Sequence, residues 1–303
     1  MEATTTGWHR MALGFALGLL GLMPTLPLLA APPAAKSAAA TAERRLVALE
    51  ARAGGRLGVV ALDTGTGRRI AHRGEERFPL CSTFKVLLAG AVLARVEKGQ
   101  ERLDRPIAYT KADLLEYAPV AAARLPEGRL TVEALCAAAV EASDNTAANL
   151  LLQTLGGPTA LTAFARGLGD AVTRLDRTEP ALNTALPGDP RDTTTPAAMV
   201  ESLKAMLLGG GLEPESCQRL EGWMRGSLTG GDRLRVGLPA TWTVGDKTGT
   251  GDRGTVNDVA ILRPPGRAPI LVAAYYTGSR APLKDRNAVL AEVGRLVVAA
   301  FKD

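Results

Sequence analysis

The strand-like segments of this chain lie near its two ends, and helix-like segments fill the middle. Apolar runs or alternations bounded by turn residues predict five strands. These strands span residues 56–63, 68–73, 241–247, 256–262 and 270–277. Because a sheet must bury at least one face, strands so far apart in sequence are expected to pair around one shared core. The order therefore favours a single antiparallel five-stranded sheet built from both ends of the chain.

Helical periodicity accounts for most of the remaining sequence. Helices are predicted over residues 41–53, 83–98, 131–142, 147–155, 159–167, 196–208, 215–222 and 285–301. The segment 83–98 is apolar nearly all round, which indicates a buried helix, and Gly99 is its natural end.

We therefore expect an α/β fold of the α+β type, with its terminal helices packed on the sheet. The sheet lobe is predicted from about 42–75 and 225–303, and an all-helical lobe from about 76–224. A cleft between the two lobes is the expected active site. The Pro- and Asp-rich stretch 176–192 is long for a segment without regular structure, and such loops are usually functional or disordered.

Residues 1–31 are predicted to be an export signal. An uncharged apolar run follows Arg10, and small residues suggest cleavage somewhere between 30 and 40. The alternative is an uncleaved membrane anchor, but Pro24 and Pro27 interrupt the run. We expect a secreted, periplasmic protein with no stable membrane association after cleavage.

Composition excludes several kinds of chemistry. The net charge is +5, but the basic residues are scattered and aromatic residues make up only 4%, so no nucleic-acid partner is expected. The only histidines are His9, in the leader, and His72, expected to be a solvated strand residue. One histidine cannot build a multi-histidine zinc site, and we expect no metal or cofactor. A general base must then come from Lys or Glu.

Four motifs could carry chemistry. In Ser82-Thr83-Phe84-Lys85, Ser and Lys lie three apart at a predicted helix start, within side-chain reach of each other. A desolvated Lys can help to deprotonate a Ser, and the helix N-terminus favours an oxyanion. A Ser followed three residues later by a Lys occurs by chance roughly once in a chain of this length with average amino-acid composition.

The other three motifs are equally ambiguous when taken singly. Ser143-Asp144-Asn145 falls between two helices, where helix capping is the alternative. Lys247-Thr248-Gly249-Thr250-Gly251 is predicted to end a strand and open a glycine turn; Gly249 would let a ligand lie along the strand edge. In the long loop, Glu179 and Asn183 could hold one water between them, or they could be solvated.

Together and in this order, the four motifs resemble those of the class A serine β-lactamases. The resemblance covers roughly residues 42–303 and includes connecting segments such as SDNTAANLLL, TRLDRTEPALN and DTTTPAAM. It implies a hydrolase of cyclic amides that opens the β-lactam ring, with the antibiotic as its small-molecule partner.

The resemblance also implies residue roles in acylation. Ser82 would attack the lactam carbonyl and form an acyl-enzyme, with Lys85 assisting proton removal. Backbone N–H groups of Ser82 and Thr250 would form the oxyanion hole. Ser143 would relay a proton to the departing lactam nitrogen, supported electrostatically by Lys247.

For deacylation, Glu179 with Asn183 would hold and activate the water. Either Lys85 or Glu179 could be the acylation base, a point disputed for the family. Asn145 would bind the side-chain amide of the drug, and Tyr117 would wall the cleft, although Tyr117 could equally be a plain surface residue.

The substrate carboxylate needs a cation. Many family members place an Arg where this chain has Val256, whereas Arg233 matches the position from which another subgroup supplies the guanidinium. Arg233, Thr248 and Thr250 are therefore assigned to the carboxylate, a surface Arg being the alternative. Arg177 and Asp192 match the ion pair that closes the base of the family's loop.

The three cysteines, Cys81, Cys136 and Cys217, are expected to be small buried thiols, since an odd number cannot all pair. The subgroup whose members resemble this chain at Arg233 and Thr250 includes carbapenemases. In those enzymes a disulfide joins the cysteine at the position of Cys81 to a cysteine directly after the position of Thr250. This chain has Gly251 at the second position. Ala89 likewise stands where a partner for Cys136 would be. No structural disulfide is predicted.

Two alternatives to the hydrolase remain. A penicillin-binding DD-peptidase would share three of the motifs and would acylate but barely deacylate, and it would lack Glu179 and Asn183 at this place. A β-lactam sensor domain would not need the full catalytic set. A monomer is the default expectation.

Overall fold

The computed structural model describes residues 33–302, with side chains from residue 38 onward. The predicted leader, residues 1–31, lies outside the described residues. Within the described part, no helix combines the length and the apolar character needed to cross a membrane.

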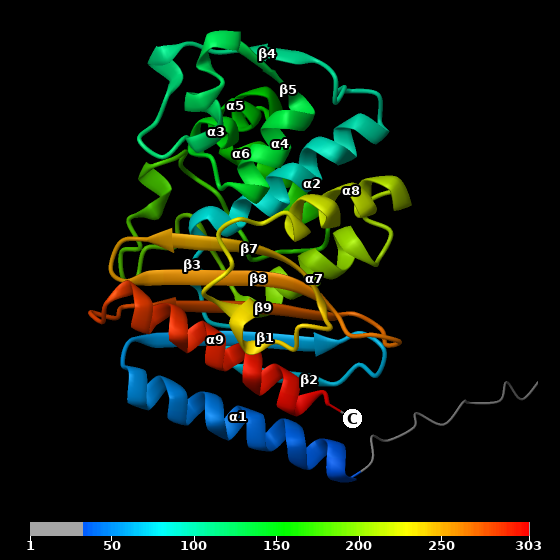
Figure 1. Ribbon diagram of the computed structural model, residues 1–303, viewed down its shortest axis with the longest axis vertical. Coiled ribbons are helices and arrows are strands. Elements are labelled where there is room, and N and C mark those ends of the chain that lie inside the picture. The colour runs from blue at the N-terminus through cyan, green and yellow to red at the C-terminus, as the bar shows by residue number, and fades with distance from the viewer. Residues whose placement is uncertain (1–32, 303) are drawn as a thin grey trace, which may run out of the picture. The chain divides into compact units, whose positions relative to one another are not determined.

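The strands near the beginning and the end of the described chain pair in one antiparallel sheet, as predicted (Figure 1). Its five strands run in the order β2-β1-β9-β8-β7. Their bounds are β1 Arg56–Asp63, β2 Arg69–His72, β7 Thr243–Gly251, β8 Thr255–Arg263 and β9 Ile270–Thr277. Arg56 at the start of β1 stands opposite Thr277 at the end of β9. The α+β fold class expected from the sequence is thus confirmed.

Both faces of the sheet are buried, because alternate residues of a strand point to opposite sides. On β1, Val59 belongs to the core beneath α1 (Pro33–Ala53) and α9 (Leu283–Ala300), whereas Val60 belongs to the core shared with the helical lobe. Figure 1 shows α1 and α9 lying across one face. The opposite face contacts α7 (Pro196–Leu207) through β1 and β9.

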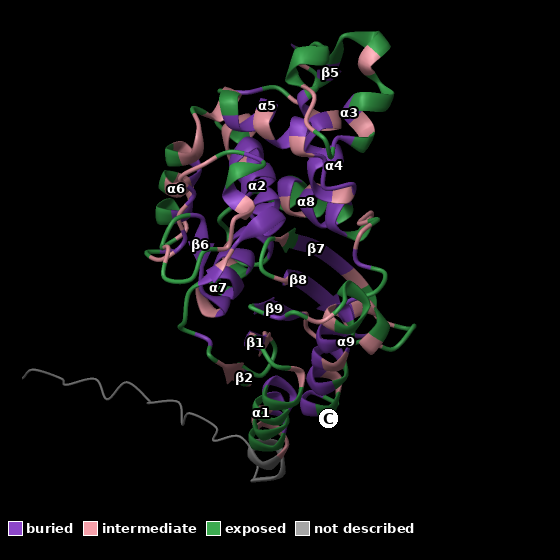
Figure 2. Cartoon of the chain, turned by 90° about the vertical axis from the view of Figure 1, so that its left-hand side faces the viewer, coloured by how far each residue is buried: buried purple, intermediate pink, exposed green. Residues whose placement is uncertain are grey.

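The helical lobe is arranged around α2 (Phe84–Glu97). Its side chains are buried without a break from Phe84 to Leu93, which confirms the buried helix predicted for this segment. Figure 2 shows this buried helix among its neighbours. Those neighbours are α4 Val132–Glu141, α5 Asn145–Leu155, α6 Pro158–Gly167 and α8 Pro214–Arg225.

Several short elements were not predicted, because segments of two to five residues carry too little periodicity. Two small strand pairs join β3 (Phe78–Pro79) to β6 (Thr193–Thr194) and β4 (Pro106–Ala108) to β5 (Arg129–Thr131). The remaining elements are α3 Pro119–Ala123 and the single-turn helices η1 Cys81–Thr83, η2 Lys111–Asp113, η3 Leu125–Glu127, η4 Ala181–Asn183 and η5 Leu234–Gly237.

Two boundaries differ from prediction for clear reasons. Helix α1 begins at Pro33 rather than at 41, since the alanine-rich stretch before it has high helix propensity. Strand β7 continues to Gly251, so the predicted glycine turn at Lys247–Gly251 is wrong. The turn lies at residues 252–254, where Arg253 and Gly254 have φ of 53° and 69°.

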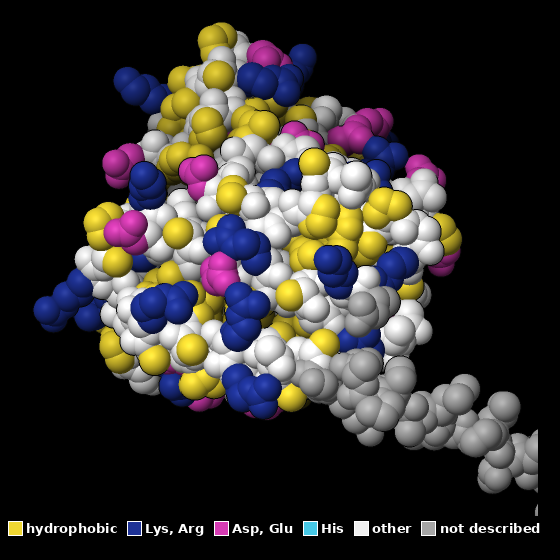
Figure 3. Space-filling view, turned by 60° about the horizontal axis from the view of Figure 1, so that its bottom comes forward, with side chains coloured by type: hydrophobic (Ala, Val, Ile, Leu, Met, Phe, Trp, Pro, Cys, Tyr) yellow, Lys and Arg dark blue, Asp and Glu magenta, His cyan; other side chains and the backbone are white. Residues whose placement is uncertain are grey.

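On the face drawn in Figure 3, the Lys and Arg side chains are separated by other residues, with Asp and Glu among them. They form no continuous basic stripe on that face.

Candidate active site

Ser82 lies at the junction of η1 and α2. The preceding residue, Cys81, has a φ of 43°, in the left-handed region that non-glycine residues seldom occupy. Such backbone strain is often found at functional sites. One helical turn later, Lys85 Nζ donates a hydrogen bond to Ser82 Oγ over 3.0 Å. The spacing of three residues therefore brings the nucleophile candidate and the lysine together, as the sequence predicted.

Lys85 is completely buried among oxygen atoms. Its Nζ lies 3.0 Å from Glu179 Oε1 and donates to Asn145 Oδ1 at 2.6 Å and to the Ser143 carbonyl at 2.8 Å. Burial lowers the pKa of Lys85, although the neighbouring Glu179 carboxylate opposes this shift. Since Ser82 Oγ also lies 3.4 Å from Glu179 Oε1, both candidate bases contact the same hydroxyl.

The Ser143-Asp144-Asn145 motif both caps a helix and faces the site. The Asp144 carboxylate accepts the Ala147 N–H at 2.8 Å as the N-cap of α5, so the capping alternative is correct for this residue. Ser143, with φ of 58°, points its hydroxyl at the ammonium of Lys247, 3.0 Å away. Burial and the nearby Lys85 hold the pKa of Lys247 well below its usual range.

Glu179 and Asn183 lie on the long loop between α6 and β6. Asn183 Nδ2 donates to Glu179 Oε2 at 2.5 Å, while the buried Asn183 Oδ1 has no hydrogen-bond partner within the described residues. That unused acceptor, beside a carboxylate, suits a water that donates to both groups.

Two further contacts set the position of this loop. Asn149 on α5 accepts the N–H of Glu179 at 3.0 Å and donates to its carbonyl at 2.9 Å. At the loop's base, Arg177 Nε bonds to Asp192 Oδ2 at 2.6 Å. Asn149 was not identified from the sequence; only its place in the segment SDNTAANLLL pointed to it.

Arg233 is buried beside the C-terminal end of β7, with a relative exposure of 5%. It donates to the carbonyls of Gly249 and Asn257 at 2.7 Å each, to Thr250 Oγ1 at 2.7 Å, and to Asn287 Oδ1 at 3.1 Å. The surface-arginine alternative is therefore wrong. Asn257 and Asn287 are positioning residues that the sequence did not reveal.

The edge of β7 needs a glycine at 249. A Cβ there would lie 3.1 Å from the Leu80 carbonyl and from Asn257 Nδ2. Next to it, Thr248 Oγ1 is hydrogen-bonded to Thr229 Oγ1 at 2.5 Å. Tyr117 is half exposed, and its carbonyl accepts the N–H of Asn145 at 3.0 Å.

These side chains surround a cleft of about 350 Å³. Its lining consists of Ser82, Tyr117, Ser143, Asn145, Asn183, Thr229, Arg233, Thr248 and Thr250. Thr229 was not predicted. Lys85, Glu179 and Lys247 are buried and contact the lining residues Ser82, Asn183 and Ser143. All catalytic candidates from the sequence thus come together at one place.

The histidine and cysteine residues of the described chain, for which no catalytic role is expected, do not line the cleft. His72 is half-buried on β2 and contacts Glu50, so the expectation of a solvated histidine is wrong. Cys81, Cys136 and Cys217 are free thiols, the first two buried. Among residues 33–302, no group of three His, Cys, Asp or Glu side chains is arranged to hold a metal ion.

Comparisons with known proteins agree with this geometry. The model of the Beta-lactamase enzyme family matches residues 41–301. The chain is 45% identical over 283 residues to Beta-lactamase CTX-M-97 of Escherichia coli, covering 93% of this chain and 97% of that protein. It is 50% identical over 262 residues to Beta-lactamase AST-1 of Nocardia asteroides, covering 86% and 84%. Among solved structures, an ancestral (GNCA) class A beta-lactamase superposes with a TM-score of 0.85 at 62% identity, covering 86% of this chain and 100% of that one.

Proposed function

Because the chain belongs to the class A serine β-lactamases, enzymes that hydrolyse β-lactam antibiotics, we propose that it does so through an acyl-enzyme on Ser82. The observation that carries this proposal is the Glu179–Asn183 pair, hydrogen-bonded at 2.5 Å, with Glu179 3.4 Å from Ser82 Oγ. Such a pair can activate the water that releases the acyl group, whereas a mere acylation target has no use for it.

In acylation, Ser82 Oγ attacks the lactam carbonyl carbon and loses its proton to Lys85 or Glu179. Both groups contact Ser82, which supports either as the base. Backbone N–H groups of Ser82 and Thr250 hold the oxyanion. When the C–N bond breaks, the Ser143 hydroxyl gives its proton to the lactam nitrogen. Ser143 then regains a proton from Lys85, whose Nζ lies 3.4 Å from Ser143 Oγ, so the proton taken from Ser82 ends on the leaving nitrogen. The ammonium of Lys247, 3.0 Å from Ser143 Oγ, stabilises the negative charge that develops on this oxygen.

In deacylation, a water held between Glu179 and Asn183 gives a proton to the Glu179 carboxylate and attacks the ester carbonyl. The Ser82–acyl bond breaks, Ser82 regains a proton, and the ring-opened product leaves. The unused acceptor Asn183 Oδ1 supports this water position. The DD-peptidase and sensor alternatives do not account for a pair aimed at the nucleophile.

Recognition of the substrate is assigned to the edge of β7. Arg233, Thr248 and Thr250 bind the carboxylate. Gly249 contributes by packing, because a Cβ there would press on the Leu80 carbonyl and Asn257. Asn145 binds the amide of the drug's side chain, and Tyr117 walls the cleft.

We also propose that the protein is exported to the periplasm, loses its leader between residues 30 and 40, acts as a monomer and confers β-lactam resistance. Two lobes, from about 42–75 with 225–303 and from about 76–224, would flank the cleft. Cell fractionation and N-terminal sequencing of the mature protein test the export and the cleavage position.

The function itself is tested with purified mature protein and a chromogenic cephalosporin. Continued turnover by the wild type, abolished in Ser82→Ala, supports the hydrolase. A single stoichiometric burst would support the penicillin-binding alternative instead.

A further inference from the structure

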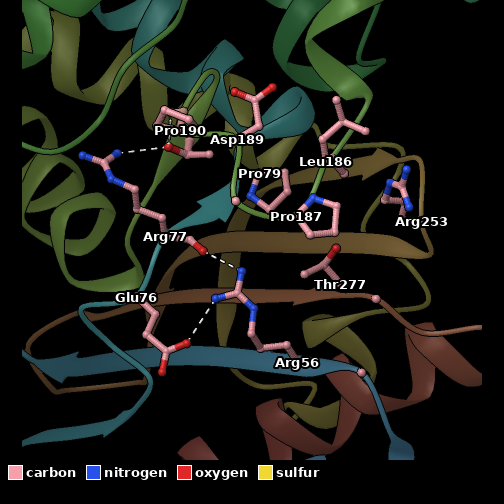
Figure 4. A pocket seen from close by; sticks show the side chains of 15 residues that line it. Arg56, Glu76, Arg77, Pro79, Leu186, Pro187, Asp189, Pro190, Arg253 and Thr277 are labelled. Carbon is pink, nitrogen blue, oxygen red and sulfur yellow. Dashed lines mark hydrogen bonds and ion pairs between the residues drawn. The ribbon is translucent and has the colours of Figure 1, made fainter.

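A second cavity lies behind the loop that carries Glu179. Its volume is about 590 Å³, against about 350 Å³ for the catalytic cleft, and the two share no lining residue. One wall is formed by residues 185–190 of the loop, and the other by the ends of β1 and β9 and the turn after β7 (Figure 4). We refer to this space as the loop cavity. Its size is typical of small-molecule sites.

Part of the loop cavity is apolar. Pro79, Leu186 and Pro187 line it, and Figure 4 draws them above the guanidinium of Arg56. Leu186 is 42% exposed, so much of its apolar surface is open to solvent at the cavity. Covering these side chains with an apolar group would remove hydrophobic surface from water.

The remaining lining carries an excess of positive charge. Its two carboxylates are already paired: Glu76 with Arg56 at 3.1 Å and with Arg73 at 2.9 Å, and Asp189 with Arg191 at 2.8 Å.

The lining also holds two guanidinium groups, Arg77 and Arg253, that form no ion pair within residues 33–302. Arg77 is engaged with neutral oxygens, the Val172 carbonyl and Thr193 Oγ1, each at 3.0 Å. Arg56 stacks on Phe78, with its guanidinium carbon 3.9 Å from the ring centroid. The cavity therefore offers cationic groups beside an apolar wall.

We propose that the loop cavity is a second binding site, for a small organic anion with an apolar body such as an aryl carboxylate or sulfonate. The anionic group lies at Arg253, and the apolar body packs on Leu186, Pro187 and Pro79. Guanidinium groups suit carboxylate and sulfonate oxygens because they donate two parallel hydrogen bonds. This site is separate from the hydrolysis of β-lactams and does not depend on it.

Occupancy of this site is linked to the position of the catalytic loop. The N–H of Asp252, next to Arg253, donates to the Asn183 carbonyl at 2.9 Å and ties the loop to the end of β7. A ligand held by Arg253 on one side and by Leu186 on the other joins the same two segments. The loop must then release the ligand before it can move away from the sheet.

Binding is tested by calorimetry on the mature enzyme with 2-naphthalenesulfonate, and with neutral 2-naphthalenemethanol as the matched probe. We expect the sulfonate to bind at least tenfold more tightly. Arg253→Gln and, separately, Leu186→Ser should each weaken it about tenfold, while Arg129→Gln, an exposed arginine on β5, should leave it unchanged. Thermal unfolding of each variant confirms that it is folded.

Hydrogen exchange provides a second readout. With the sulfonate at ten times its dissociation constant, exchange at residues 184–190 and at Asp252 should slow by up to about elevenfold in the wild type and not in Arg253→Gln. Equal affinity for the two probes, or binding that Arg253→Gln and Leu186→Ser leave intact, would overturn the proposal. The latter result would place the anion outside the loop cavity.

Discussion

The role of Arg233 can be tested by changing its shape while keeping its charge. A guanidinium has five N–H donors. In the structure four of them are directed at Gly249, Asn257, Thr250 and Asn287, so one remains for the substrate carboxylate. Arg233→Lys supplies only three donors on a flexible stem and cannot satisfy these partners and the substrate together.

The expected loss follows from that single remaining donor. A hydrogen bond to a charged group contributes about 1.5–3 kcal/mol, which corresponds to a decrease of about 10- to 150-fold in kcat/KM. The assay compares benzylpenicillin with its methyl ester, which lacks the carboxylate, in wild type and Arg233→Lys. We expect the substitution to impair hydrolysis of the acid and to have little further effect on the ester. If both substrates lose activity equally, Arg233 only supports the fold of the site and the assignment is wrong.

Three other changes probe the surroundings of Ser82. Asn149→Ala removes both hydrogen bonds to the backbone of Glu179, so deacylation should slow about tenfold and acyl-enzyme should accumulate in stopped-flow traces; unchanged single-turnover rates would contradict this. Because the pKa of Lys247 is lowered, its positive charge is present at low pH and is lost as pH rises through that pKa, so kcat/KM should fall on the alkaline side below pH 10.5. Lys247→Arg should move that fall to higher pH, and an unmoved profile would assign it to another group. Asp192→Asn leaves the partly buried Arg177 without its counter-charge and should lower the free energy of unfolding by about 3 kcal/mol in urea titrations, whereas a loss below 1 kcal/mol would make the pair a surface contact.

Local spacing was enough to predict the centre of the site. Ser82 and Lys85 meet because they are one helical turn apart, and the order of strands and helices was enough to predict the sheet. These features depend on residues near one another in sequence or on a periodicity that extends over a whole element.

Residues whose role depends on distant partners were missed. Asn149 acts on a loop that follows it by one further helix, and Asn257 and Asn287 support Arg233 from β8 and α9. Nothing in the local sequence distinguishes Asn257 or Asn287 from other asparagines, and Asn149 was marked only by its place in the segment SDNTAANLLL. Gly249 and Gly251 were taken for a turn, because a glycine required by close approach of neighbouring atoms looks the same in sequence as one required by a turn. The loop cavity likewise exists only because five separate segments meet.

The most direct test of the account is the fate of the acyl group on Ser82 when Glu179 is changed. Glu179→Gln keeps the size of the side chain but removes the carboxylate that activates the water. Intact-mass spectrometry after mixing with penicillin should then show one drug molecule added to the variant, located on Ser82 by peptide mapping, and no lasting adduct on the wild type. A variant that carries no adduct and turns over penicillin as fast as the wild type would contradict the role of Glu179.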